Sequence, residues 1–81
     1  MSKLPRDIDG TTLVKKLAAY KYEIISQKGS HIHLVSRYMK EDHRITIPDH
    51  SPIKIGTLNN ILKSISDYLK IDKFELIDRL K

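Results

Sequence analysis

Several residue types that stabilise small proteins or give them chemistry are missing from this sequence. The chain of 81 residues has no cysteine and no tryptophan, and only one phenylalanine. Disulfide bonds and thiolate metal sites are therefore excluded, and the lack of cysteine fits a reducing compartment, so we expect a cytoplasmic protein. A chain of this length forms one domain, in which almost every apolar side chain must join a single core. We predict one domain over residues 1–81.

Long apolar runs are also absent. The first seven residues, Met1 to Asp7, include none, whereas a signal peptide or a membrane anchor requires one. We therefore expect no targeting segment and no membrane partner. Internal repeats, linkers and low-complexity tracts, which would indicate further domains, are missing as well.

What the chain does contain is a surplus of positive charge. It has 15 lysines and arginines against 10 aspartates and glutamates, which gives a formal net charge of +5. Such a balance favours an anionic partner, most often nucleic acid, although it also serves solubility. All four histidines lie between His31 and His50. We therefore expect the active surface in the middle of the chain.

Apolar spacing predicts one helix before a central β region and two helices after it. The first helix ends near Tyr20 and has Asp9 or Thr11 available as its N-cap. The second helix has Thr57 as its N-cap, and a capping box begins the third helix at Asp72. The apolar stripes of these helices are Leu13, Val14, Leu17 and Ala18, then Leu58, Ile61, Leu62, Ile65 and Leu69, then Phe74, Ile77 and Leu80.

Three strands are predicted between the first and second helices. Residues 22–26 are rich in aromatic and β-branched side chains, and the four residues that follow supply a turn. Strand side chains alternate between the two faces of a sheet, so Ile32 and Leu34 share one face of the next strand. In the last strand Ile45 and Ile47 share one face. The opposite faces carry His31, His33, Val35 and Arg37 in one strand and Arg44 and Thr46 in the other.

The simplest way to bury the apolar faces gives an α+β fold in the order α-β-β-β-α-α. The helices pack on one face of a three-stranded antiparallel sheet, and the other face stays open. A shift of one residue in the strand register would expose the isoleucines and bury the charged residues, at a large energetic cost. The open face is therefore predicted to carry polar side chains, most of them basic or imidazole: His31, His33, Arg37, Arg44 and Thr46.

A surface of this kind suits RNA cleavage. The 2′-hydroxyl of RNA attacks the adjacent phosphate once a base has taken its proton, and a metal is not required. Histidine suits the role of base because its ordinary pKa is about 6.5. Lys28, Arg37 and Arg44 could stabilise the phosphorane. Exposed histidines on basic strands also occur without any function, so these residues alone do not decide the question.

Three segments taken together resemble the HicA family of toxin ribonucleases. The segments are Lys28-Gly29-Ser30-His31 before a strand, His43-Arg44-Ile45-Thr46-Ile47-Pro48 with His50, and Ile55-Gly56-Thr57-Leu58 before Ile61-Leu62-Lys63. The resemblance runs in order from the first helix to Leu80. It implies a fold like that of double-stranded-RNA-binding domains and the toxin of a type II toxin–antitoxin system, which cleaves mRNA without a metal or other cofactor. It further implies that His31 is the catalytic residue and that a HicB-like antitoxin covers the active face.

The sequence departs from the family pattern just before the turn. The family often has a glycine and an aromatic residue ahead of the first strand, and an arginine three residues ahead of the Gly-Ser-His turn. Here these positions hold Lys21, Tyr22 and Ser26. Lys21 and Lys28 could compensate for the missing arginine, although lysine and arginine do not bind phosphate with the same geometry.

The remaining candidate residues have more than one interpretation. His33 could either contact the RNA or transfer a second proton. Gly56-Thr57 either begins a capped helix or presents free amides to an RNA phosphate. His43 is interpreted as a turn or edge residue, His50 as a residue that seats a loop, and no metal site is expected because the strands offer only a His-x-His pair. The predicted RNA and phosphate contacts are Lys28, Gly29, Ser30, His33, Arg37, Arg44, Lys54 and Thr57.

Two other functions stay open at this point. A non-catalytic RNA-binding module would use the same face to hold phosphates. A degenerate relative of the family would serve as a protein-interaction domain, with an antitoxin-like partner on the open face. Cleavage of RNA would separate the predicted nuclease from both alternatives.

Overall fold

The structure is a computed structural model that describes residues 7–80. The expectation of no signal peptide and no anchor concerns residues that, apart from Asp7, lie outside this range. Within the range, no helix is both long enough and apolar enough to cross a membrane.

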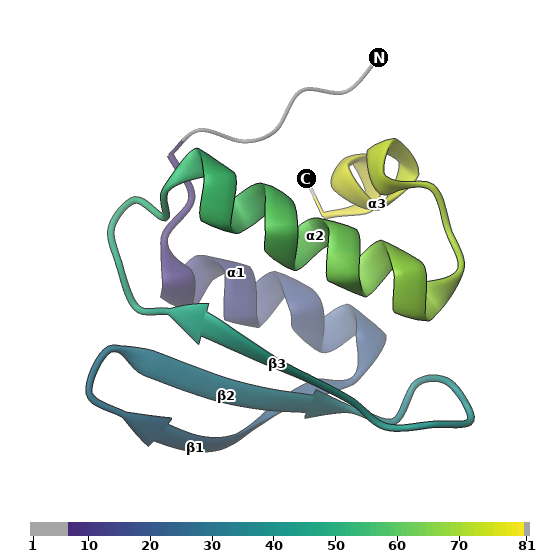
Figure 1. Cartoon of the computed structure of the whole chain (residues 1–81), viewed down its shortest axis with the longest axis horizontal. Helices are drawn as coiled ribbons and strands as arrows, with labels where there is room; N and C mark the ends of the chain where they lie inside the picture. The colour runs from purple at the N-terminus through teal and green to yellow at the C-terminus, as the bar shows by residue number, and fades with distance from the viewer. Residues whose placement is uncertain (1–6, 81) are drawn as a thin grey trace.

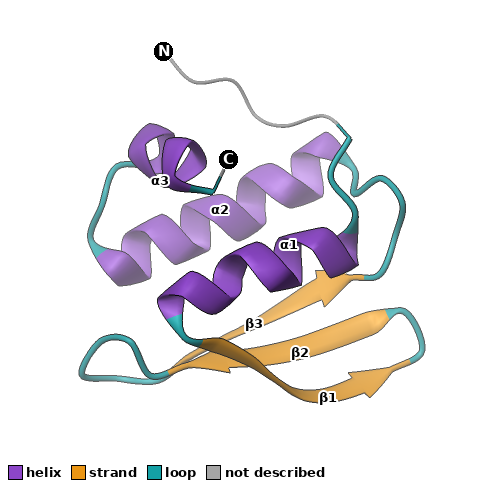
Figure 2. Cartoon of the chain, turned by 180° about the vertical axis from the view of Figure 1, so that it is seen from behind, coloured by secondary structure: helices purple, strands orange, loops and turns teal. Residues whose placement is uncertain are grey.

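Helices and strands follow one another in the predicted order. A 3₁₀ turn over Ala18–Tyr20 extends the first helix, in agreement with its predicted end. The strands form one antiparallel sheet in the order β1-β2-β3, and Figures 1 and 2 show the helices on one side of it. The predicted α+β fold is confirmed. In residues 7–80 the elements are α1 (Gly10–Leu17), β1 (Tyr22–Lys28), β2 (His31–Ser36), β3 (His43–Pro48), α2 (Ile55–Leu69) and α3 (Lys73–Arg79).

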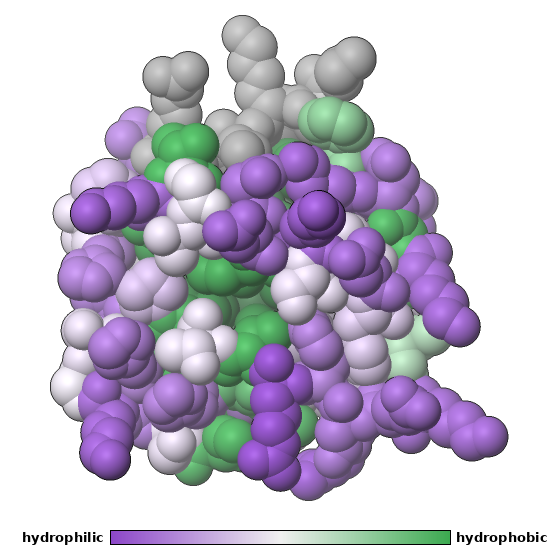
Figure 3. All heavy atoms as spheres, viewed as in Figure 1, coloured by the Kyte–Doolittle hydropathy of each residue, from purple (hydrophilic) through white to green (hydrophobic). Residues whose placement is uncertain are grey.

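The core lies between the sheet and the helices, and strand alternation decides which strand residues enter it. Ile32 and Leu34 of β2 are paired with Ile47 and Ile45 of β3, and all four side chains are buried. The predicted apolar stripe of α2 is buried in the same core. On the face shown in Figure 3, polar and charged residues cover most of the surface, and apolar residues are visible mainly in the middle.

The N-termini of α1 and α2 are not capped as predicted. Asp9 is the N-cap of α1, but its carboxylate accepts a hydrogen bond from Ser51 Oγ at 2.6 Å and none from the helix amides. Helix α2 begins at Ile55 and has Lys54 as its N-cap. Thr57 therefore lies inside the first turn, and the prediction that it caps this helix is wrong.

The start of α3 follows the prediction only in part. The Asp72 carboxylate accepts a hydrogen bond from the Phe74 amide at 2.9 Å, as a capping residue does. Glu75 does not complete a capping box, because its carboxylate pairs with Arg79 at 2.7 Å. Phe74 was predicted to be apolar core but is 41% exposed, and Leu76 is buried in its place. The face of α3 that meets the core is therefore formed by Leu76, Ile77 and Leu80.

The β1–β2 hairpin is tighter than predicted. Strand β1 continues past Ser26 to Lys28, and the turn consists of Gly29-Ser30 alone. Gly29 has a φ of 60°, and a positive φ at the first position is what a two-residue hairpin turn of this kind requires. A β-bulge lies between Ile24 and Ser26. The short turn delivers the chain directly into β2 at His31.

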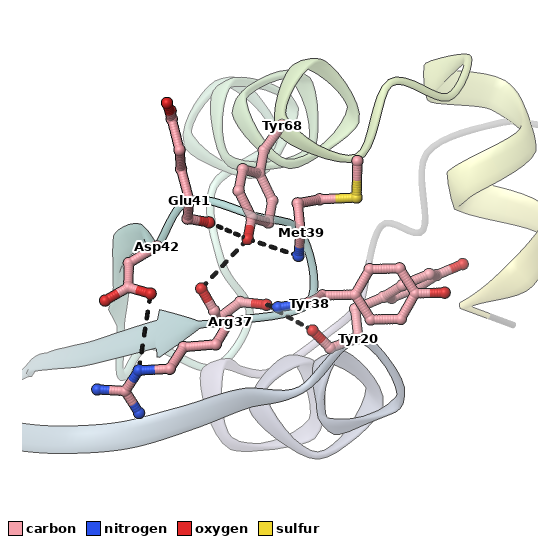
Figure 4. A network of polar contacts seen from close by, with 8 residues as sticks. Tyr20, Arg37, Tyr38, Met39, Glu41, Asp42 and Tyr68 are labelled. Atoms are coloured by element: carbon pink, nitrogen blue, oxygen red, sulfur yellow. Dashed lines mark hydrogen bonds and ion pairs between the residues drawn. The ribbon is translucent and has the colours of Figure 1, made fainter.

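The loop between β2 and β3 is fixed by the hydroxyl groups of Ser36 and Tyr68, and Figure 4 shows the contacts of Tyr68. Ser36 Oγ donates a hydrogen bond to the Tyr20 carbonyl at 2.6 Å and accepts one from the Tyr38 amide at 3.1 Å. Tyr68 Oη, from α2, accepts a hydrogen bond from the Met39 amide at 2.9 Å. These contacts hold the far end of the sheet to both helical segments around it.

Candidate active site

The sheet face that points away from the helices carries most of the predicted site residues. Lys28 of β1 is paired with His31 of β2, and His33 of β2 is paired with Ser26 on one side and Thr46 on the other. Residues directly opposed in antiparallel strands place their Cβ atoms about 5 Å apart on the same face. The antiparallel register therefore gathers these side chains into one surface.

His31 is the first residue of β2 and is exposed. The turn before it is attached to the end of β3, because the Asp49 amide donates a hydrogen bond to the Ser30 carbonyl at 2.6 Å. Among residues 7–80, the structure shows no hydrogen bond to the His31 ring. The imidazole is therefore available to a bound molecule. Lys28, which is paired with His31 on the neighbouring strand, places an ammonium group on the same face.

A shallow groove of about 310 Å³ adjoins His33 on this face. His33 Nδ1 lies 2.9 Å from Thr46 Oγ1, so the ring is held in one orientation. The exposed Arg44 lines the same groove. A guanidinium and an imidazole beside one another suit a phosphate group, since both donate hydrogen bonds to phosphate oxygens. The side chains of the open face that line the groove are Ile25, Ser26, His33, Arg44 and Thr46.

Three predicted binding residues lie away from His31. Arg37 follows β2 at its opposite end, roughly 20 Å along the strand, and its guanidinium lies 3.6 Å from the Asp42 carboxylate. Lys54 and Thr57 belong to the start of α2, in the helix layer. Figures 1 and 2 place that start at the same end of the molecule as the β1–β2 turn. The predicted residues that the turn and the groove bring together are Lys28, Gly29, Ser30, His31, His33 and Arg44.

His43 is the first residue of the edge strand β3, which agrees with its interpretation as a turn or edge residue, but its ring faces the helices. Its Nδ1 lies 2.7 Å from Tyr22 Oη, its Nε2 lies 3.0 Å from Ser64 Oγ, and its ring stacks on Tyr68 with the centroids 4.6 Å apart. Burial lowers the pKa of His43 because the imidazolium loses hydration. Burial also raises the pKa of Tyr22, and the nearby Tyr68 adds to that rise. His43 therefore links the sheet to α2 and has no free ring nitrogen for a substrate.

His50 lies exposed in the loop after β3. Its backbone carbonyl accepts a hydrogen bond from the Gly10 amide at 3.1 Å, which agrees with the predicted role in seating this loop. Within residues 7–80, no three histidine, aspartate or glutamate side chains lie close enough together to hold a metal ion.

Sequence reasoning missed two features of the groove. The bulge in β1 allows Ile25 to line the groove. The available signal was the Ile24-Ile25 pair, because two consecutive residues of a strand cannot both face the core, and the two side chains are 55% and 50% exposed. Thr46 was placed on the correct face, but its contact with His33 depends on the antiparallel register.

Comparison with known proteins gives a family for this arrangement. A family model described as the HicA toxin of bacterial toxin–antitoxin systems matches residues 10–66. The match covers more than half of the chain, from the start of α1 through the open face and most of α2. The comparisons with curated proteins and with solved structures each gave no match. On the family match, this chain belongs to the HicA family of toxins from bacterial toxin–antitoxin systems.

Proposed function

We propose that this toxin is an endoribonuclease that cleaves mRNA without a metal ion and that His31 is its catalytic residue. The observation that carries the proposal is the position of the His31 imidazole, exposed and opposite Lys28 on a sheet face away from the helices. The attachment of Ser30 to the end of β3 supports it, because a fixed turn holds the backbone from which the imidazole projects.

The proposed reaction uses the nucleophile that RNA itself carries. His31 takes the proton of the 2′-hydroxyl, and the 2′-oxygen attacks the adjacent phosphorus. The bond from phosphorus to the 5′-oxygen breaks, which leaves a 2′,3′-cyclic phosphate and a 5′-hydroxyl. Lys28 beside His31 and Arg44 in the groove stabilise the charge on the phosphorane. Gly29 and Ser30 present backbone and a small side chain, so the RNA strand can approach the turn closely.

Phosphates further along the RNA would meet the other basic positions. The amides at the start of α2, with Lys54 and Thr57, lie at the same end of the molecule as the turn and suit a phosphate of the same strand. Arg37 lies beyond the other end of β2 and is ion-paired with Asp42. We therefore propose that Arg37 contacts an RNA phosphate remote from the cleaved bond.

The same face also provides a way to inhibit the toxin. A toxin of a toxin–antitoxin system has a partner antitoxin, and we propose a HicB-like protein whose acidic residues cover the open face. Complementary charge opposite Lys28 and Arg44 would direct this association, and coverage of His31 would stop cleavage.

Cleavage of a long mRNA by the wild-type protein and by His31→Ala, both in excess chelator, tests the nuclease proposal. The variant should lose a factor of about 10²–10⁴ in rate and should keep the circular dichroism spectrum of the wild type, since His31 is exposed. His50→Ala is the matched control, because His50 is another exposed histidine, and it should cleave like the wild type.

Unchanged cleavage by His31→Ala would contradict the proposed role of this residue. Binding of RNA that weakens with salt, without cleavage by the wild type, would favour the non-catalytic RNA-binding module instead.

A further inference from the structure

The proposed reaction needs a second proton carrier. His31 takes the proton of the 2′-hydroxyl, and the 5′-oxygen must gain a proton as it leaves, because an alkoxide is a poor leaving group. We propose that His33 donates this proton and that Thr46 is the positioning residue that orients it. This inference rests on the proposed nuclease activity.

The spacing of the two histidines fits the two ends of the reacting phosphate. His31 and His33 lie on the same face of β2, two residues apart, which separates their Cα atoms by about 7 Å. In an in-line displacement the attacking and leaving oxygens lie on opposite sides of phosphorus. A phosphoryl group with a hydrogen bond of about 2.8 Å at each end spans a distance of this order. One imidazole can therefore serve the 2′-oxygen while the other serves the 5′-oxygen.

The contact between His33 and Thr46 decides which ring nitrogen is available. His33 Nδ1 lies 2.9 Å from Thr46 Oγ1, and a hydroxyl oxygen can accept a hydrogen bond from Nδ1–H in both protonation states of the ring. The proton that moves is then the one on Nε2. After transfer, His33 is neutral and still donates from Nδ1, so the ring keeps its orientation. Arg44, which lines the same groove, is placed to hold the phosphate beside it.

The other histidines are less suited to this role. His43 faces the helices, and both of its ring nitrogens are engaged by Tyr22 and Ser64. His50 lies in the loop beyond β3, and within residues 7–80 the structure shows no hydrogen bond that would orient its ring.

The proposed step is balanced in protons and electrons. One proton passes from the 2′-oxygen to His31, and one passes from His33 Nε2 to the 5′-oxygen. A bond forms between the 2′-oxygen and phosphorus, and the bond between phosphorus and the 5′-oxygen breaks with its electron pair on the leaving oxygen. Exchange with water then restores the neutral His31 and the protonated His33.

A change of leaving group tests this role directly. The wild-type protein is first used to map one cleavage position in an mRNA. Two short RNAs that span this position are then made, a natural one and one with sulfur in place of the leaving 5′-oxygen. A thiolate leaves without a proton, since thiols have a pKa of about 8.5. Rates are measured in single turnovers at saturating protein, so that weaker binding does not affect the comparison.

The expected signature is specific to a proton donor. His33→Ala should cleave the natural RNA about 100-fold more slowly than wild type and the sulfur RNA within about threefold of wild type. Thr46→Val removes the hydroxyl but keeps the shape of the side chain. Its cleavage rate on the natural RNA should fall by less than that of His33→Ala, and its rate on the sulfur RNA should again be close to that of the wild type. This second variant keeps the test valid if His33→Ala does not fold. His31→Ala should be slow on both RNAs, because the 2′-hydroxyl still needs a base.

Other cleavage patterns would contradict either the role of His33 or the nuclease proposal. Equal losses on both RNAs for His33→Ala would show that His33 only binds or supports the site, which overturns the inference and leaves the nuclease proposal intact. Recovery with sulfur in His31→Ala or His50→Ala would assign the proton donor to that residue and overturn the inference. No cleavage of either RNA by the wild type would overturn the nuclease proposal itself.

Discussion

Gly10 is the position where the structure makes its sharpest prediction about stability. It is the buried first residue of α1, and a Cβ atom added there would lie 2.3 Å from the Pro48 carbonyl oxygen and 3.0 Å from Asp49 Cα. Both atoms belong to backbone at the end of β3, which cannot move aside as the tip of a flexible side chain can. Gly10→Ala should therefore force α1 and this part of the sheet apart.

The size of the effect follows from two opposing contributions. Overpacking of a rigid site costs about 3 kcal/mol at the upper end of its usual range, whereas alanine gains about 0.5 kcal/mol over glycine in the first turn of a helix. The net loss of unfolding free energy should be about 2.5 kcal/mol. For a domain of this size each kcal/mol lowers the melting temperature by about 4–8 °C, so the variant should melt about 10–20 °C below wild type.

Gly56 provides the matched control, because a Cβ there would meet nothing within 4 Å. Gly56→Ala lies in the first turn of α2 and should raise the free energy of unfolding by about 0.5 kcal/mol through helix propensity. Thermal and urea unfolding, followed by circular dichroism, measure both variants. A Gly10→Ala protein as stable as the wild type would refute the close approach of α1 and β3. A destabilised Gly56→Ala would refute the open surroundings of that residue.

Two further changes test the helix side of the sheet and the start of β1. Burial lowers the pKa of His43 in the folded state, so the unfolded chain takes up the proton at a higher pH than the folded chain does. The free energy of unfolding should therefore fall as the pH drops below about 6.5, the pKa of histidine in the unfolded chain, and continue to fall until the lower folded pKa is reached. Urea midpoints at neutral and mildly acidic pH should show this loss in the wild type and a smaller loss in His43→Gln, and equal losses would contradict it. Lys21 has a left-handed φ of 62°, which costs a residue with a side chain about 1–2 kcal/mol. Lys21→Gly should raise the unfolding free energy by about 0.5 kcal/mol after the entropy of the unfolded glycine is subtracted, and a less stable variant would show that the backbone there is not strained.

The sequence was sufficient to predict the sheet and its two faces because burial depends on alternation. Four isoleucine and leucine side chains at alternate positions of β2 and β3 would all leave the core if the register shifted by one residue. The exposed position of His31 and the common face of His33, Arg44 and Thr46 follow from the same alternation. The candidate site could therefore be assigned to the open face without knowledge of any distance.

Features that depend on one local contact could not be predicted in this way. The carboxylate of Asp9 is a suitable cap for α1, but the Ser51 hydroxyl, distant in sequence, binds it instead. Thr57 is a good N-cap residue by type, but α2 begins earlier, at Ile55. The β-bulge at Ile24 and Ser26 also has no strong signal in the sequence. The contact between Asp9 and Ser51 joins segments 42 residues apart, and the local sequence around Asp9 does not reveal it.

The histidines show that the face of the sheet on which a residue lies decides what its side chain can contact. In the register of β2 and β3, Ser36 is paired with His43 and His31 with Pro48, so residues with odd numbers in β2 and residues with even numbers in β3 share the open face. His31 and His33 therefore face solvent, while His43 faces α2 and is held through both ring nitrogens. A proton taken up by His43 acts on the stability of the fold, whereas in the proposed reaction a proton taken up by His31 acts on a bound RNA. The pH dependence of stability should consequently respond to substitution of His43, and that of cleavage to substitution of His31.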